Sequence, residues 1–302
     1  MKIEKLNETN AFVAIDLEGA PCSTGVVRAA GKVLQGGAKA MARTTTYTFA
    51  LRELQVGGAS AGISADDDAR EAAIAAFVEE LAPRAASGEL VLDAGKGVDP
   101  AALQPLREGD PRAALRDEAV DGHPLPAHLH ALGVVVAAEA ALGSLDGVTA
   151  AVEPGPDAER IGALLEARGA ASVTPDLTAE ADVLLCGSRQ GMVDGAMAAA
   201  IRSKVVVPTG PHALSAKGLA VLNGRDVVAL PDFLTLAGPT FAGWPADADT
   251  PDAAVAAAEA WVAATVREVM SHDEGPVLGA CYAAEAFLST WRDELPFGRP
   301  LA

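Results

Sequence analysis

Ionisable side chains lie in loop-like segments of the sequence, where they could act on a bound substrate. Asp93 follows an apolar run, and Lys96 stands three residues later with a glycine on each side. A carboxylate and an ammonium in one loop can hold a charged substrate and move its protons. The simpler interpretation of Lys96 is a solvated loop lysine, so Asp93 is the stronger candidate.

Histidines occupy further positions that suit proton transfer. His128 and His130 alternate in the segment Pro126–Ala131, and His212 follows a proline. On an extended segment, His128 and His130 would face one cleft and could bind a metal or transfer protons. Polar residues at a domain hinge are the simpler interpretation. The acidic triplet 66–68 lacks the spaced ligands of a calcium loop, and we predict no metal site.

Composition restricts the partners of the protein. The chain has 302 residues, of which 50% are hydrophobic, and a net charge of −18. So acidic a surface repels nucleic acid and anionic membranes. The three cysteines have no CxxC spacing, the N-terminus has no apolar leader, and the longest apolar stretch, 131–142, is too short to span a bilayer. We therefore expect a cytoplasmic protein with no nucleic-acid or membrane partner.

The second half of the chain alternates short strand-like runs with alanine-rich helical segments. That alternation is typical of βαβ units around a parallel sheet. We predict strands at 147–152, 170–174, 182–186, 204–208 and 226–230, and helices at 157–168, 191–202 and 213–222.

The remaining segments give fewer strand signals. Buried strands are expected at 11–17 and 89–92, and the apolar residues of 69–86 repeat with helical spacing. Further helices are predicted at 36–54, 129–142, 251–270 and 278–293.

Four segments together resemble the glutamate/leucine/phenylalanine/valine dehydrogenase family of amino-acid dehydrogenases. Thr46–Ser60 is similar to the family's TYK…GGxK element, and Asp93–Val98 is similar to its DVGT loop. Ala131–Ala141 resembles the helix that leads into the nucleotide-binding domain, and Pro231–Gly238 resembles the PDFxxNAGG loop. The four matches together are far more specific than any one of them.

This resemblance implies an α/β fold of two domains with a substrate cleft. Residues 1–128 and 251–302 would form the substrate and oligomerisation domain, and 129–250 would form a Rossmann-like domain. The family also implies NAD or NADP as cofactor, an amino- or keto-acid-like small molecule as ligand, and assembly into a homo-oligomer.

The resemblance places Asp93 on the family's catalytic carboxylate, but both catalytic lysines are replaced. Thr48 stands at the lysine that grips the substrate carboxylate, and Ser60 stands at the lysine that assists catalysis. The glycine pair Gly57 and Gly58 is expected to form a tight turn. The family's reaction needs one ammonium to fix the carboxylate and one amine of lowered pKa to activate water. Hydroxyls supply neither, and loss of the base alone would lower the rate about 10²–10⁴-fold.

The nucleotide-binding loop is degenerate. The family's GxGxxG becomes Glu153-Pro-Gly-Pro-Asp-Ala158, in which Gly155 is kept and Ala158 stands at the third glycine. Its prolines lack the N–H groups that bind pyrophosphate, and Glu153 brings a negative charge toward it. Asp176 stands where the family's acidic residue holds the ribose, although an Asp in such a loop is more often a cap. We expect dinucleotide binding through Gly155, Ala158 and Asp176 to be weak or lost.

The predicted substrate cleft has changed as well. His130 takes the slot of a threonine that contacts nicotinamide, and His128 lies beside it. His212 belongs to the dipeptide that replaces an Asn-Asn turn, and Leu236 replaces the Asn of NAGG. We expect these residues to line the cleft together with the glycine pair, and His130 to join Asp93 and Lys96 as a candidate for chemistry.

Three functions are consistent with this sequence. The first is a repurposed enzyme that acts on an amino-, imino- or keto-acid-like molecule, for instance in specialised biosynthesis. The second is a catalytically inactive pseudoenzyme that serves as a scaffold or partner subunit. The third is an NAD(P)-dependent amino-acid dehydrogenase with replacement groups such as Lys96. New ionisable groups favour the first, a plugged cleft would favour the second, and a measured dinucleotide affinity would favour the third.

Overall fold

A computed structural model describes residues 1–244 and 248–301 of the chain. The chain forms two compact units: unit 1 consists of Met1–Pro111 and Ala284–Pro300, and unit 2 contains Arg112–Ala283. The sequence pattern suggested limits at 128 and 251 instead. Both positions fall within helices of unit 2, so these helices belong to the same unit as the parallel sheet they flank.

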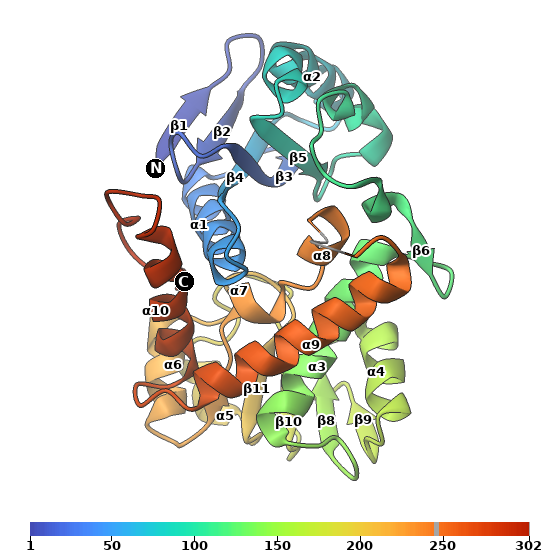
Figure 1. The fold of residues 1–302 in the computed structure, drawn as a ribbon, viewed down its shortest axis with the longest axis vertical. Coiled ribbons are helices and arrows are strands. Elements are labelled where there is room, and N and C mark those ends of the chain that lie inside the picture. Colours follow the sequence, from blue (N-terminus) through green and yellow to red (C-terminus); the bar gives the residue numbers. More distant parts are fainter. Residues whose placement is uncertain (245–247, 302) are drawn as a thin grey trace. The chain divides into compact units, whose positions relative to one another are not determined.

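Unit 1 is built on a mixed sheet with the strand order β1-β2-β4-β3-β5 (Figure 1). β3 runs parallel to β4 and β5, whereas β2 is antiparallel to β1 and β4. The strands are β1 (Lys2–Lys5), β2 (Ala11–Ile15), β3 (Cys22–Ala30), β4 (Val56–Ser64) and β5 (Leu90–Ala94).

Helices cover both faces of the unit 1 sheet. On one face α1 packs through alanines against Phe12 and Ala14 of β2. On the other face α2 and η1 join the alternate residues of β2, such as Val13, around Phe77. Successive side chains of a strand point to opposite faces, so one sheet carries two cores. The helices are α1 (Gln35–Leu51), α2 (Arg70–Ala86) and the 3₁₀ helix η1 (Pro100–Arg107).

Unit 2 contains a parallel sheet with the strand order β12-β11-β10-β8-β9. The predicted α/β fold with a Rossmann-like sheet is confirmed. The strands are β8 (Thr149–Val152), β9 (Ser172–Thr174), β10 (Val183–Cys186), β11 (Val205–Pro208) and β12 (Val228–Ala229). The helices between them are α4 (Ala158–Ala167), α5 (Gly195–Ala200) and α6 (Ala216–Asn223).

Shorter elements and three longer helices complete the described part of the chain. A hairpin precedes α3, and the segment 231–244 contains two one-turn helices. These elements are η2 (Ala114–Asp117), β6 (Ala119–Val120), β7 (His123–Pro124), α3 (Leu125–Leu142), α7 (Asp232–Thr235), α8 (Thr240–Gly243), α9 (Pro251–Met270) and α10 (Pro276–Leu288).

α3 is the one helix in the described residues that is long and apolar enough to cross a membrane. It is 61% buried, however, and it packs against α9, α4 and β11 within unit 2. A helix that is apolar on all sides and buried by neighbouring elements has the character of a core helix.

β3 and β4 are long strands that the sequence pattern does not predict. β4 reads VGGASAGIS, and glycine, alanine and serine give a weak strand signal. The small residues serve close packing: a Cβ at Gly58 would lie 1.8 Å from the carbonyl oxygen of Ala42 in α1. Gly57 and Gly58 are strand residues without positive φ, so the predicted tight turn is wrong.

Candidate functional site

The unit 1 sheet brings two predicted catalytic positions onto one face. Ser60 in β4 is in register with Val26 in β3, which is in register with Asp93 in β5. Side chains in register on neighbouring strands point the same way, so Ser60 and Asp93 share a face at two strand spacings, about 10 Å. This is the face that α1 covers, because Gly58, two residues before Ser60, approaches the backbone of that helix.

The hydroxyls of Thr48 and Ser60, which the resemblance aligns with the family's lysines, are turned inward. Thr48 is buried, and its hydroxyl donates a hydrogen bond to the backbone oxygen of Thr44, 3.1 Å away within α1. Ser60 is fully buried, and its Oγ has no hydrogen-bond partner. Neither hydroxyl supplies the positive charge of a lysine, and the Thr48 hydroxyl is bonded to the preceding helical turn.

Lys96 lies in the turn after β5, three residues after the half-buried Asp93. Its side chain is exposed, and its carbonyl accepts a hydrogen bond from the N–H of Ala29 at 3.0 Å. Gly97 has φ +81°, and a Cβ there would lie 2.1 Å from the carbonyl oxygen of Ala29. The turn therefore holds the Lys96 backbone against β3 while its ammonium stays in solvent.

Unit 1 also contains a buried ion pair that the sequence pattern does not reveal. Arg43 of α1 donates to both carboxylate oxygens of Asp16 at 2.8–2.9 Å. Its Nη1 donates to the backbone oxygens of Phe297 and Gly298. The two side chains are 8% and 0% exposed, so removal of either partner would leave a buried charge unpaired.

In unit 2, the loop after β8 carries its own anion. Glu153 accepts hydrogen bonds from the N–H of Gly187 at 2.7 Å, from the N–H of Ser188 at 2.9 Å and from the Ser188 hydroxyl. The carboxylate thus bridges the carboxyl ends of β8 and β10, where N–H groups meet phosphate in dinucleotide-binding folds. Gly155 has open space around its Cβ position, and Ala158 begins α4.

Asp176 lies in the loop after β9 and acts as a local cap. Its carboxylate accepts hydrogen bonds from the N–H and the hydroxyl of Thr178, at 2.9 and 2.8 Å. The Thr178 backbone bond lowers the pKa of the Asp176 carboxyl. The ribose-binding role stays a prediction, because the cap accounts for the position of this side chain.

Cys186 at the end of β10 is an unreactive thiol. Burial, with a contribution from Glu153, raises the pKa of Cys186 to about 12. The thiolate is therefore scarcely populated at neutral pH, and Cys186 is not a nucleophile.

His212 and Asp232 form a buried polar pair in unit 2. The His212 N–H donates to the Asp232 carboxylate, which also accepts from the N–H of Phe233 at 2.8 Å. Burial raises the pKa of Asp232, and His212 opposes that shift. His212 has φ +56°, a left-handed conformation that is uncommon for a residue other than glycine. Leu236 ends α7 with its N–H bonded to the Asp232 carbonyl at 2.9 Å.

His128 and His130 lie in α3, so the predicted extended segment is wrong. Residues two apart on an α-helix point about 200° from each other, and these two therefore do not face one cleft. His130 Nε2 lies 3.6 Å from Asp157 Oδ2, while His128 is 7% exposed with an unpaired Nδ1. Burial lowers the pKa of both imidazoles, which are neutral near pH 7. Over residues 1–244 and 248–301, no group of three or more His, Cys, Asp and Glu side chains is arranged to hold a metal ion.

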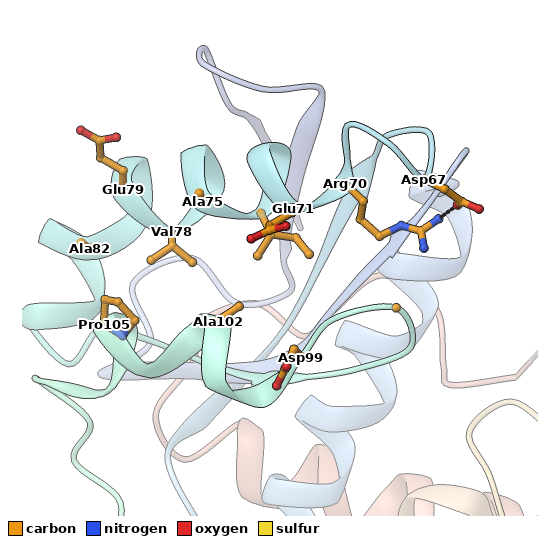
Figure 2. A pocket seen from close by; sticks show the side chains of 12 residues that line it. Asp67, Arg70, Glu71, Ala75, Val78, Glu79, Ala82, Asp99, Ala102 and Pro105 are labelled. Carbon is orange, nitrogen blue, oxygen red and sulfur yellow. Dashed lines mark hydrogen bonds and ion pairs between the residues drawn. The ribbon is translucent and has the colours of Figure 1, made fainter.

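A groove of about 920 Å³ lies in unit 1, and none of the predicted site residues lines it (Figure 2). Val78 of α2 points toward Ala102 and Pro105 of η1 across it. Acidic side chains dominate the rim, and Arg70 there is paired with Asp67. The groove thus offers volume without any of the groups predicted for chemistry.

Comparison with solved structures identifies the fold. No protein-family model matches the sequence, and no curated protein matches it in sequence. The structure is similar to a hetero-hexameric glutamate dehydrogenase from Thermus thermophilus, crystallised with leucine, at 21% identity and a TM-score of 0.75, over 95% of this chain and 86% of that one. L-tryptophan dehydrogenase from Nostoc punctiforme matches at 15% identity and a TM-score of 0.72, over 96% of both chains. Glutamate dehydrogenase 2 from Plasmodium falciparum matches at 14% and 0.73, over 93% and 81%. The dehydrogenase fold predicted from the four segments is confirmed.

Proposed function

We propose that this chain, which has the amino-acid dehydrogenase fold, is an enzyme that no longer performs NAD-dependent oxidative deamination. Its substrate in this proposal is an amino-, imino- or keto-acid-like small molecule. The observation that carries the proposal is the Glu153 carboxylate at the carboxyl end of the parallel sheet.

A dinucleotide would compete with Glu153 for the same donors. Pyrophosphate binding at this edge depends on free N–H groups and tolerates little nearby negative charge. Glu153 takes the N–H groups of Gly187 and Ser188, and its own charge repels phosphate. We expect both NAD and NADP to bind weakly or not at all.

The former lysine positions support the same proposal. The Thr48 hydroxyl is bonded within α1, and Ser60 is sealed in the sheet, so no ammonium stands at either place. Asp93 remains on the face that Ser60 shares. In oxidative deamination, one lysine of the family holds the substrate carboxylate and another activates the water. In this chain both the carboxylate and the water would lack that lysine.

Proton transfer is the reaction class that the remaining groups suit. Asp232 has a pKa raised by burial and lies against His212, a combination found where side chains exchange protons near neutral pH. Asp93, Lys96 and His130 are the further candidates. Exchange of a proton on the carbon next to a carboxylate, carbonyl or imine group requires no hydride acceptor, so it is compatible with the loss of dinucleotide binding.

Dinucleotide titration tests the first half of the proposal. Wild-type protein should bind NAD and NADP with a Kd weaker than about 100 μM, measured by calorimetry. Glu153→Ala should tighten that Kd about fivefold or more, because it frees the two N–H groups and removes the charge. Glu159→Gln removes a nearby charge that does not bond those groups and serves as the matched control. A wild-type Kd tighter than about 100 μM would instead support an active dehydrogenase.

Proton exchange tests the second half. In deuterated buffer with the protein present, amino acids should lose the NMR signal of the proton on the carbon next to their carboxylate. Keto and imino acids should lose the signal of the protons on the carbon next to their carbonyl or imine group. Asp232→Asn should slow that exchange about 10²-fold or more, and Asp273→Asn, an exposed change in unit 2, should leave it unchanged. If no acid exchanges and none shifts the melting temperature, the enzyme proposal fails.

An inactive scaffold or partner subunit is the alternative, favoured by the sealed Ser60 and the internally bonded Thr48. The Thermus thermophilus relative is a hetero-hexamer, and we propose that this chain assembles as a homo-oligomer in the cytoplasm. Light scattering of the purified protein tests the homo-oligomer: a stable monomer would contradict it. Persistent absence of exchange with an intact oligomer would support the scaffold.

A further inference from the structure

A pocket of about 410 Å³ in unit 2 contains neither Asp232 nor His212. It lies where the β6–β7 hairpin meets the first turns of α3 and α4, and Figure 1 shows β6 beside α3. We call it the hairpin pocket, and its walls come from 121, 123, 127–128, 156–157, 159–160 and 163–164.

Two buried nitrogen atoms of the hairpin pocket have no hydrogen-bond partner. They are Nδ1 of His128 and Nη1 of Arg160. His128 is only 7% exposed, so water does not readily replace the missing partner. Most buried polar atoms in native proteins have a hydrogen-bond partner. Two nitrogen atoms without a partner in one pocket therefore indicate a ligand that carries hydrogen-bond acceptors.

Acidic groups face the same two side chains. Asp121 acts electrostatically on both His128 and Arg160, and Asp157 also acts on Arg160. Burial and the neighbouring Arg160 lower the pKa of His128, so its imidazole is neutral near pH 7. The guanidinium is then the permanent cation of the pocket, and the carboxylates stand around it.

A tight turn fixes the acidic side of the hairpin pocket. Asp121 and Gly122 connect β6 to β7, with φ values of +52° and +77°. Two left-handed residues in a two-residue loop form a type I′ turn, for which Asp-Gly is a preferred sequence. Asp121 is therefore presented by a defined turn.

We propose that the hairpin pocket binds a small zwitterion whose carboxylate is held by Arg160 and His128 and whose ammonium is held by Asp121 and Asp157. The Arg160 fork matches a carboxylate, and a neutral His128 can donate from Nδ1. Ala163 and Leu164 provide an apolar wall for a short side chain. The volume lies within the range of small-ligand sites. The site does not include Asp232, Asp93 or Lys96, although its Asp157 also lies 3.6 Å from His130, a further candidate for the proposed reaction.

Binding of small probes tests each half of this recognition. Glycine and L-alanine carry both charges, acetate carries only the anion, and ethylamine carries only the cation. We expect one glycine or alanine per chain with a Kd of about 1 mM, and at least about tenfold weaker binding of acetate and ethylamine. Histidine-edited NMR should show the His128 signal moving with the zwitterions.

Two variants and their controls separate the hairpin pocket from other sites. Arg160→Gln and Asp121→Asn should each weaken glycine binding about tenfold or more. Arg202→Gln and Asp273→Asn make the same chemical changes at exposed positions of unit 2 and should have no effect. Asp121 lies on an exposed turn, so its variant tests the site even if the Arg160 variant fails to fold. Equal binding of acetate, undiminished binding by Asp121→Asn, or no saturable binding of glycine or alanine up to about 50 mM would overturn the proposal. The readout is binding alone, so a failed enzyme proposal leaves this result interpretable.

Discussion

Asp182 and Glu153 are carboxylates at opposite ends of the parallel sheet of unit 2. Asp182 lies before β10, accepts hydrogen bonds from the N–H and hydroxyl of Thr149 at 3.0 and 2.9 Å, and pairs with Lys204 at 2.7 Å. The Lys204 bond, followed by those of Thr149, lowers the pKa of Asp182 to about 2. Glu153 lies after β8 and accepts bonds from N–H and O–H groups that carry no charge.

The two ends therefore use the same side-chain chemistry for different purposes. At the amino ends, Asp182 ties the starts of β8, β10 and β11 together and is neutralised by a cation. Parallel sheets bind ligands at their carboxyl ends. There the Glu153 carboxylate, which has no cation beside it among the described residues, accepts hydrogen bonds from the N–H groups that a ligand would use. The Asp182 carboxylate is paired with the Lys204 ammonium. The Glu153 carboxylate has no such cation in the part of the chain that the structure describes and takes the place that the anionic group of a ligand would occupy.

The largest effect is expected from Gly210→Ala at the carboxyl end. A Cβ at Gly210 would lie 2.1 Å from the carbonyl oxygen of Gly187, the residue that donates to Glu153. Overpacking against backbone should lower the free energy of unfolding by about 3 kcal/mol, measured in denaturant. Gly224→Ala meets only ordinary contacts at 3.5 and 3.7 Å and should change it by less than about 1 kcal/mol. Equal effects of the two would show that the carboxyl end is not tightly packed.

Asp182→Asn should come next, at the amino end. Loss of the charge-assisted bonds should cost about 1.5–2 kcal/mol at pH 7, reduced by the solvent exposure of Lys204. The folded pKa lies below the ordinary value of 3.8, so the wild-type advantage is present above that pH and is lost as pH falls toward about 2. Unfolding titrations of both proteins between pH 7 and pH 2 measure this. A difference that stays constant through the acid range would refute the ion-pair account.

Glu153→Gln should have a smaller effect on stability. The amide oxygen still accepts a bond from the Gly187 or Ser188 N–H, and no ion pair is broken, so a loss of about 0.5–1 kcal/mol is expected. Chemical denaturation beside Asp182→Asn gives the comparison directly. If Glu153→Gln proves the more damaging of the two, the carboxylate is a structural anchor of the sheet and not a stand-in for a ligand.

The smallest effect is the pH dependence that His128 adds. Its folded pKa lies below 6.5, so the unfolded chain holds the proton more tightly and stability falls as pH drops below about 6.5. His128→Gln should flatten the pH dependence of the unfolding free energy between pH 7 and pH 5, because it removes the group whose pKa burial lowers.

Strong periodicity explains which parts of the fold the sequence revealed. The apolar spacing of 69–86 and the alternation after residue 147 correspond to α2 and to the parallel sheet. The sequence pattern does not predict β4, because its small residues allow α1 to pack closely. Such a tertiary contact leaves no local strand pattern. The start of α3 was misread for a related reason, since Pro126 suggested a hinge and instead occupies the first turn of the helix.

The sequence predicts which residue types belong to the candidate site, but it does not predict how those residues are placed in space. Asp93 and Ser60 could be named from the four similar segments, but their shared face follows from a strand order that no short window encodes. The sequence shows that Glu153 brings a negative charge toward the phosphate site. It does not show the hydrogen bonds of Glu153 to the loop after β10, because these join residues 34 and 35 positions apart. Arg160 carried no sequence signal, because only folding leaves its Nη1 buried beside His128.

The Arg43 ion pair has a consequence for the order in which the chain folds. Asp16 and Arg43 both lie in the first segment of unit 1, but the Phe297 and Gly298 carbonyls that complete the guanidinium's bonds lie 254 and 255 residues after Arg43. The parallel sheet of unit 2 ends at Ala229 in the sequence, so on the ribosome it can form before those acceptors are made. Unit 1 can close around its buried charge only after Phe297 and Gly298 have been made. Pulse-labelling hydrogen exchange should accordingly find the α1 amides protected later than those of β10 and β11.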